Sequence, residues 1–225
     1  MNQESLDNNL DYHKITASEL ISFKTYLPKI KNSFSLIKKH FIGKTKTYIY
    51  VVNNRKICSL PITFQNRHFM HLCGVKYIKG ASGFVKDLKK SRLKLDGLYL
   101  KEDGSTFQKL EVIDKIDLLD TLGTTVSIGN NIARIHYDNL LRTKTNILGI
   151  AVDTDKYGMH FPLSLLNISV EDTHTLTSFS VVAILEESQR THVKKCLLKQ
   201  RNCPRKLNEY IEKLLDNQIT QNSIK

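Results

Sequence analysis

The segment HFMHLCGVKYIKG, at residues 68–80, combines several side chains that can do chemistry. His68 and His71 are three positions apart, Cys73 follows, and Gly74 precedes two lysines. Such a set could hold a metal ion, pair a thiol with a base, or contact nucleic acid. The apolar residues between the polar ones also fit a plain core segment, in which His71 would only satisfy a hydrogen bond. The pattern predicts a short helical turn that ends at Gly74.

The metal and thiol interpretations have little support. A zinc site needs three or four suitably spaced ligands. The pair His68 and His71 lacks the glutamate of an HExxH motif, and no second pair follows at zinc-finger spacing. Cys73 and His71 are two apart, and positions two apart on a helix face different directions. The GASG stretch at 80–83 lacks the ending of a phosphate-binding loop. We therefore expect no metal ion and no other cofactor.

Metal-independent RNA cleavage remains possible because it needs only a few common functional groups. One group takes the proton of the ribose 2′-OH, a second protonates the leaving oxygen, and cations stabilise the pentavalent phosphate. Such residues come from separate elements, so no compact motif marks them. The candidates are His71, Lys144, Thr145, His160 and His174. A lone histidine in a strand is more often structural and a lysine in a turn more often solvated, so both interpretations stay open.

The net charge of +12 is concentrated in two basic strips, residues 76–101 and 194–206. Together they hold 14 bases against 2 acids, and the remaining 20 bases and 20 acids cancel. Clustered basic residues on a neutral body are typical of a polyanion-binding surface, although they are also compatible with solvated faces. We expect RNA to contact ten of these bases: Lys76, Lys79, Lys86, Lys89, Lys90, Arg92, Lys194, Lys195, Lys199 and Arg201.

Hydrophobic periodicity predicts an α+β fold with a helical N-terminal half that contains one hairpin, then an antiparallel meander and a C-terminal helix. A capping box at Thr16 begins a helix that Pro28 should interrupt, and further helices are expected near 82–92 and 108–122. The hairpin covers 45–64, the meander strands 133–140, 146–154, 159–168 and 178–187, and the last helix 204–218. We divide the chain into an N-terminal helical segment (1–44), a nuclease-like α+β domain (45–200) and a C-terminal helix packed on it (201–225).

The remaining features favour the cytoplasm. The longest apolar run, ILGIAV at 147–152, is far shorter than a membrane span, and the polar N-terminus does not resemble a signal peptide. The cysteines at 58, 73, 196 and 203 have no paired spacing, which is typical of free thiols in a reducing compartment.

Two segments resemble the phage-associated barnase–EndoU–colicin–RelE-like nuclease domains. The first, Phe69 to Gly74, is similar to an F-x-H-L-[ST]-G motif, with Cys73 in place of the usual serine or threonine. The second, His160 to His174, is similar to a Y-[VF]-P-N-[ST]-x-L-x-x-D-I-R motif. The match is loose: Phe161, Pro162 and Asp172 fit it, Ser164 stands near the usual serine or threonine, and His174 replaces the usual arginine. The resemblance extends over about residues 45–200.

The resemblance implies a metal-free RNA endonuclease that acts as a toxin or a phage-defence effector and has an antitoxin or other regulatory protein as a partner. It implies that His71 transfers a proton, Lys144 stabilises the phosphate and His174 makes the complementary proton transfer. Histidine cannot hold phosphate with two hydrogen bonds as arginine does, so the change at 174 affects phosphate binding. The changes at Cys73 and His174 favour one alternative, a nucleic-acid-binding module without catalysis. The basic strips leave a second one open, a protein inhibitor whose basic surface meets an acidic protein.

Overall fold

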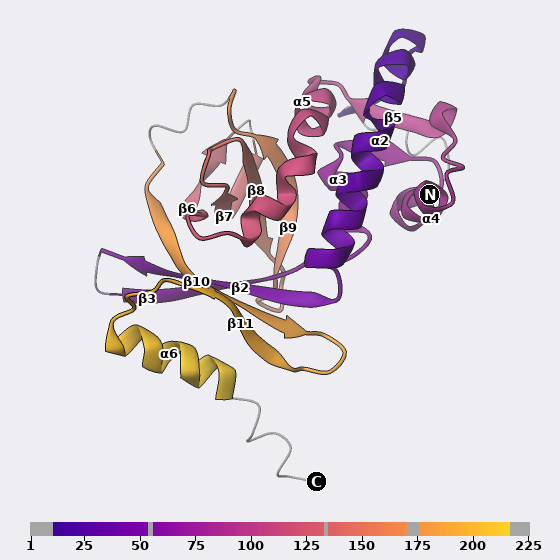
Figure 1. Ribbon diagram of the computed structural model, residues 1–225. Coiled ribbons are helices and arrows are strands. Elements are labelled where there is room, and N and C mark those ends of the chain that lie inside the picture. Colours follow the sequence, from indigo (N-terminus) through magenta and orange to yellow (C-terminus); the bar gives the residue numbers. More distant parts are fainter. Residues whose placement is uncertain (1–10, 54–55, 133–134, 171–175, 217–225) are drawn as a thin grey trace.

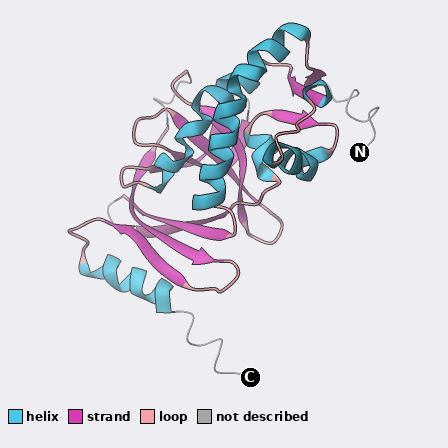
Figure 2. Cartoon of the chain, turned by 45° about the vertical axis from the view of Figure 1, so that its right-hand side comes forward, coloured by secondary structure: helices cyan, strands magenta, loops and turns pink. Residues whose placement is uncertain are grey.

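The computed structural model describes residues 11–53, 56–132, 135–170 and 176–216, and they form the expected α+β fold (Figure 1). One group of elements is mostly helical and includes a small sheet. The other is a large sheet that carries a separate helix at its far end (Figure 2). The mostly helical group comprises β1 (Tyr12–Lys14), α2 (Ala17–His40), α3 (His68–Leu72), β4 (Val75–Tyr77), α4 (Gly80–Lys89), β5 (Leu98–Lys101), α5 (Ser105–Val112) and the 3-10 segments η1 (Leu95–Gly97) and η2 (Ile113–Asp120).

The long helix α2 begins at the predicted capping box, in which the Thr16 hydroxyl accepts from the Glu19 backbone N–H. Our prediction that Pro28 divides this region into two helices is wrong, because α2 continues through it. Proline removes one backbone donor and leaves the carbonyl four residues earlier without its partner. Pro28 and Lys24 are both on the exposed face of α2, so water can solvate that carbonyl. The opposite face stays buried and holds the helix together.

The predicted turn around His71 is helix α3, and it ends at Gly74 with φ of +70°. Phe69, Met70 and Leu72 are buried. The chain then enters β4, which pairs with β5, and β5 pairs with β1. The predicted helix near 82–92 is α4, and the helical stretch near 108–122 consists of α5 followed by η2.

The large sheet has the strand order β11-β10-β2-β3-β9-β8-β7-β6, and β10 also pairs with β6, so the sheet closes on itself. Its strands are β2 (Lys44–Val52), β3 (Lys56–Thr63), β6 (Thr125–Ile132), β7 (Ile135–Arg142), β8 (Leu148–Thr154), β9 (His160–Asn167), β10 (Ser178–Ser188) and β11 (Lys194–Lys199). The predicted hairpin is β2–β3. The four predicted meander strands are β7 to β10, but only β7, β8 and β9 lie side by side in chain order, because β10 pairs with β11, β2 and β6 instead of β9. The hairpin is inserted between β10 and β9 in this same sheet, which local patterns could not reveal.

The predicted C-terminal helix is α6 (Arg205–Asp216), and it packs on the far end of the large sheet. Leu207 and Ile211 are its buried residues, and they join a small core with Ile49 and Leu185. The face of α6 away from the sheet is charged. This end of the molecule is remote from α3 and α4 (Figure 2).

A buried lysine ties the sheet to η2. Lys46 is 1% exposed, and its Nζ lies 2.7 Å from Asp120 Oδ2 and 3.0 Å from Glu186 Oε2. Glu186 also pairs with Lys44 and Lys195. Burial opposes ionisation of Glu186, but hydrogen bonds from Lys46 and Lys195 outweigh it and lower its pKa to about 2. The charged form of Glu186 therefore stabilises the fold.

We expect Glu186→Gln to lower the free energy of unfolding by about 2 kcal/mol at pH 7, because a charged group leaves a buried network. The folded-state pKa is below the ordinary 4.5, so this stabilisation is full above pH 4.5 and is lost as the pH falls toward 2. Urea unfolding should show a smaller difference in unfolding free energy between the unaltered protein and Glu186→Gln at pH 3 than at pH 7. Glu209→Gln, which alters an exposed pair with Arg205, is the control and should change stability by less than about 0.5 kcal/mol. If the difference in unfolding free energy between the unaltered protein and Glu186→Gln does not change with pH, the charged form of Glu186 is not what stabilises the fold.

Candidate active site

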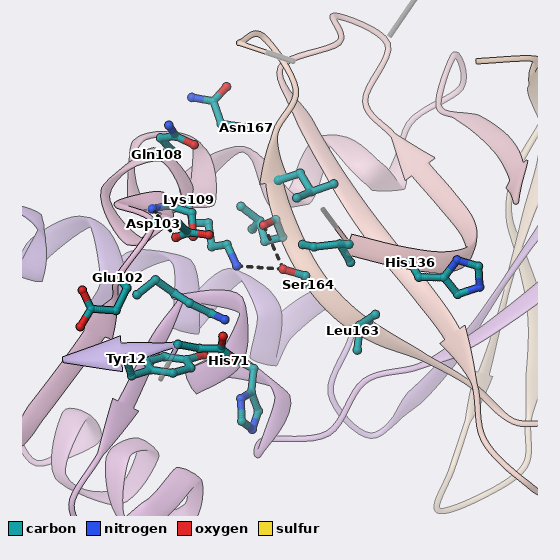
Figure 3. Close-up of a pocket in the computed structure, with 16 residues that line it drawn as sticks. Tyr12, His71, Glu102, Asp103, Gln108, Lys109, His136, Leu163, Ser164 and Asn167 are labelled. Carbon is teal, nitrogen blue, oxygen red and sulfur yellow. Dashed lines mark hydrogen bonds between the residues drawn. The ribbon is translucent and has the colours of Figure 1, made fainter. Parts of the chain in front are cut away.

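A cavity of about 620 Å³ lies between the three-stranded sheet, α5 and β9 (Figure 3). It is formed by residues that are far apart in the sequence. The lining residues central to the chemistry are Tyr12, His71, Lys101, Gln108, Lys109 and Ser164. The cavity therefore brings together the two segments that resemble the nuclease motifs.

His71 lies in the last turn of α3 with part of its ring exposed to the cavity. Partial burial and the charges of Lys76 and Lys109 lower its pKa below the ordinary 6.5. The imidazole is therefore neutral at neutral pH and can accept a proton. This is the state that a general base needs.

Lys109 projects from α5 and is only 4% exposed. Its Nζ donates to Ser164 Oγ on β9 at 2.8 Å (Figure 3). Burial, with a further contribution from the charge of Lys101, lowers its pKa to about 8. Lys109 is thus mainly a cation near pH 7, but one that can release its proton more readily than an ordinary lysine.

The absence of a side chain at Gly74 leaves room for the Lys109 side chain beside the backbone. A Cβ at this position would lie 2.9 Å from Lys109 Cδ and 3.2 Å from Thr106 Cα, and the positive φ also favours glycine. Thr106 then links the parts of the site: its hydroxyl donates to the Gly74 carbonyl at 2.6 Å and accepts from the Lys101 backbone N–H at 3.0 Å. One buried threonine therefore fixes α5, the end of α3 and the end of β5 relative to each other.

We expect Thr106→Val to destabilise the fold by about 2 kcal/mol, because it leaves the buried carbonyl of Gly74 and the N–H of Lys101 without their partner. Chemical denaturation measures this loss. Thr25→Val is the matched control, since the Thr25 hydroxyl makes an exposed hydrogen bond within α2. Equal effects of the two substitutions would show that Thr106 does not link these elements.

Acidic side chains line the cavity beside the lysines, but local interactions engage them. Asp103 accepts from the Ser105 backbone N–H at 2.9 Å, and Glu102 lies 3.4 Å from His13. Asn167, at the end of β9, donates to Glu111. The cavity is therefore of mixed charge, and its cationic part is the region of His71, Lys101 and Lys109.

The structure does not bring all the predicted catalytic residues together. Lys144 is exposed in the turn between β7 and β8, where its side chain covers Gly123, and it is not among the described residues that line the cavity. Thr145 belongs to the same turn. His160 is on β9, within hydrogen-bonding distance of the Thr154 hydroxyl. His174 lies outside the described residues.

Sequence reasoning missed Lys109 and Lys101 as site residues. The sequence does contain a signal for Lys109. It precedes the apolar residues Val112, Ile113 and Ile116 by three, four and seven positions, so it lies on the inward face of the helical stretch. A lysine in an apolar stripe needs a partner or a function. His136 also lines the cavity but lies apart from His71 and Lys109 (Figure 3).

The two basic strips lie at opposite ends of the molecule (Figures 1 and 2). In the first, Lys79 and Arg92 both pair with buried Asp87, at 2.6 and 3.1 Å. Lys86, Lys89 and Lys90 line a second, shallower pocket on α4. In the second strip, Lys194 and Lys195 are on β11, Lys199 bonds Asn208 of α6, and Arg201 is exposed in the following turn. The first strip adjoins the cavity and the second does not.

Two searches of the described part of the chain give negative results. No group of three or more His, Cys, Asp or Glu side chains is placed to hold a metal ion there. Within the same ranges, no helix is both long enough and apolar enough to cross a bilayer.

The structure thus combines helices packed beside a large, mainly antiparallel sheet with a cavity lined by a histidine and lysines. The chain belongs to the family described as phage-Barnase-EndoU-ColicinE5/D-RelE like nuclease 4, whose sequence profile matches residues 29–202. Comparison with curated proteins and with solved structures gives no match. Membership of this family confirms the resemblance drawn from the two motifs.

Proposed function

We propose that the protein is a metal-independent RNA endonuclease that cleaves by attack of the ribose 2′-OH on the adjacent phosphate. The observation that carries this proposal is the meeting of His71 with Lys101 and Lys109 in one cavity. A neutral imidazole beside two cations supplies both requirements of the reaction, a proton acceptor and charge stabilisation.

In the proposed reaction, His71 takes the proton of the 2′-OH, and the 2′ oxygen attacks phosphorus. Lys101 and Lys109 stabilise the negative charge of the pentavalent phosphate. The bond from phosphorus to the 5′ oxygen breaks, and that oxygen leaves with a proton. The products are a 2′,3′-cyclic phosphate and a 5′-hydroxyl, so no water is consumed in this step.

The proton for the leaving oxygen can come from Lys109, whose lowered pKa of about 8 makes it a better donor than an ordinary lysine. The sequence-based proposal gives that role to His174 and phosphate stabilisation to Lys144. We transfer phosphate stabilisation to Lys101 and Lys109, because they share the cavity with His71. The role of His174 remains a prediction.

The change to Cys73 does not favour the alternative of a binding module without catalysis. Cys73 follows α3, is fully buried, and is not among the described residues that line the cavity. Burial raises the pKa of its thiol, so it stays protonated. The substitution of serine or threonine by cysteine therefore changes the packing beneath α3 rather than the groups that face a substrate.

The family description names phage, and this supports a role as a toxin or an effector in conflict between phages and their hosts. We propose a cytoplasmic location, supported by four cysteines that are all free thiols. An antitoxin or other regulatory protein is the partner we expect.

Incubation with total RNA in excess EDTA tests the proposed function. Cleavage that survives EDTA and leaves cyclic phosphate ends would support it. Tight, salt-dependent binding without any cleavage between pH 5 and pH 9 would instead support the alternative of a binding module without catalysis. In such a module each phosphate contact adds roughly 0.7 to the slope of log affinity against log salt concentration on single strands.

A further inference from the structure

Strand β1 contributes to the cavity although it precedes the residues that the family profile matches, 29–202. We propose that Tyr12 of this strand is a positioning residue, which holds the ammonium groups of Lys76 and Lys101 beside His71 for binding a substrate phosphate. The proposal rests on the proposed function for its substrate, but its structural part can be tested separately.

The register of the small sheet places these side chains on one face. Tyr12 is directly opposite Lys101 across the β1–β5 pair, and Lys76 is directly opposite Tyr99 across the β4–β5 pair. Residues opposite each other in an antiparallel pair point to the same face, as do residues two apart on one strand. Lys101 and Tyr99 are two apart, so Tyr12, Lys101 and Lys76 share that face.

The ring of Tyr12 contacts both cations. Lys76 Nζ lies 4.3 Å from the ring centroid and Lys101 Nζ lies 4.4 Å from it. The negative face of an aromatic ring attracts an ammonium group within about 6 Å. One half-buried ring therefore offsets part of the repulsion between two lysines and restricts where their charges can lie.

These two lysines also act on His71, since both of their charges lower its pKa. Burial raises the pKa of Tyr12 to about 12, so the phenol stays neutral over the working pH range and adds no charge of its own. If Tyr12 fixes the two lysines, loss of the ring must change both phosphate binding and the titration of His71. A purely structural residue would not produce this pair of effects.

Four variants of the full-length protein test this inference: Tyr12→Phe, Tyr12→Leu, Tyr12→4-cyanophenylalanine and Tyr157→Leu. Phenylalanine keeps the ring face, whereas leucine removes it. 4-Cyanophenylalanine keeps the size of the ring but withdraws electron density from its face, so it weakens the contact with little change in packing. Tyr157→Leu is the control, because Tyr157 is exposed and, within the described residues, its ring makes a cation–π contact only with its neighbour Lys156.

We expect Tyr12→Leu and the cyano variant to raise KM for RNA about tenfold, the size expected from two partly desolvated cation–π contacts, with a smaller change in kcat. NMR titration should show the His71 pKa rising toward 6.5 in both variants, because the lysines move away. Tyr157→Leu should match the unaltered protein, and Tyr12→Phe should recover the KM and the His71 titration that Tyr12→Leu loses.

An unchanged KM and His71 titration in the cyano variant would overturn the inference even if Tyr12→Leu fails to fold. Equal effects of phenylalanine and leucine would overturn it as well, since they would implicate the hydroxyl group. If the unaltered protein cleaves no RNA, the proposed function fails, while the His71 titration still decides whether Tyr12 positions the lysines.

Discussion

Replacing His71 by asparagine is expected to lower the rate of RNA cleavage by about 10²–10⁴-fold, the range that general acid–base groups contribute. Asparagine is close in size to histidine but cannot take up a proton near neutral pH. The ring of His71 is partly exposed, and its neighbours Phe69, Met70 and Leu72 carry the packing of α3, so the fold should be retained. Single-turnover cleavage of a labelled RNA in excess EDTA measures the loss.

His192→Asn is the matched control. His192 is exposed in the turn between β10 and β11 and is not among the described residues that line the cavity. Its φ is +55°, a conformation that asparagine tolerates. The control should cleave RNA at the normal rate. A His71→Asn protein that still cleaves at that rate would show that another group is the base.

The unaltered protein should lose its RNA cleavage as the pH falls through the pKa of His71. The neighbouring lysines and partial burial lower that pKa, so the acidic limb of the pH profile should lie below 6.5. A limb at or above 6.5 would mean that the lysines do not lie near His71 in solution.

Local patterns in the sequence predict most of the elements because each depends on nearby residues. The capping box at Thr16, the stop at Gly74 and the short turns between β7, β8 and β9 all act over a few residues. The path of α2 through Pro28 was mispredicted because the opposite face of the helix supplies the missing stability by packing. The position of the β2–β3 hairpin in the large sheet depends on contacts far apart in sequence.

The candidate site shows the same division. His71 is predictable from its motif and from the turn that presents it. Lys109 and Ser164 are 55 residues apart in the chain, and only the packing of α5 against β9 brings them together. Lys101 is aligned by the register of a three-residue strand, Tyr12–Lys14, which is too short to give a pattern. Lys144 was chosen from its local context, and such context does not specify which turn borders a cavity.

Lys109→Met is expected to lower the cleavage rate by about 10²–10³-fold, as loss of a preorganised charge-stabilising group does. The pKa of Lys109 is lowered to about 8 by burial, so the ammonium form that the reaction needs is lost as the pH rises through that value. The unaltered protein should therefore show an alkaline limb near pH 8. This limb should be absent from the residual activity of the variant.

The same substitution should make the fold more stable at pH 7. In the unfolded chain the pKa of lysine is about 10.5, so from pH 8 to pH 10.5 the unfolded state binds more protons and stability rises with pH. Below pH 8 the lysine is charged in both states, and the folded protein carries the full cost of burying that charge. This cost is roughly 3 kcal/mol for the pKa difference, and loss of the hydrogen bond to Ser164 offsets about 1 kcal/mol of the gain. We expect Lys109→Met to unfold at a higher urea concentration at pH 7, with an advantage of about 2 kcal/mol that shrinks above pH 8.

Lys144→Met is the matched control, since Lys144 is an exposed lysine that the sequence alone places in the phosphate role. If the cavity is the active site, this variant keeps both its activity and its stability. Loss of cleavage in Lys144→Met, with normal cleavage in Lys109→Met, would show that Lys144 in the β7–β8 turn stabilises the phosphate. A Lys109→Met protein that is both less active and less stable would identify Lys109 as a structural residue. Higher stability together with lower activity is the combination that a buried lysine retained for catalysis must show.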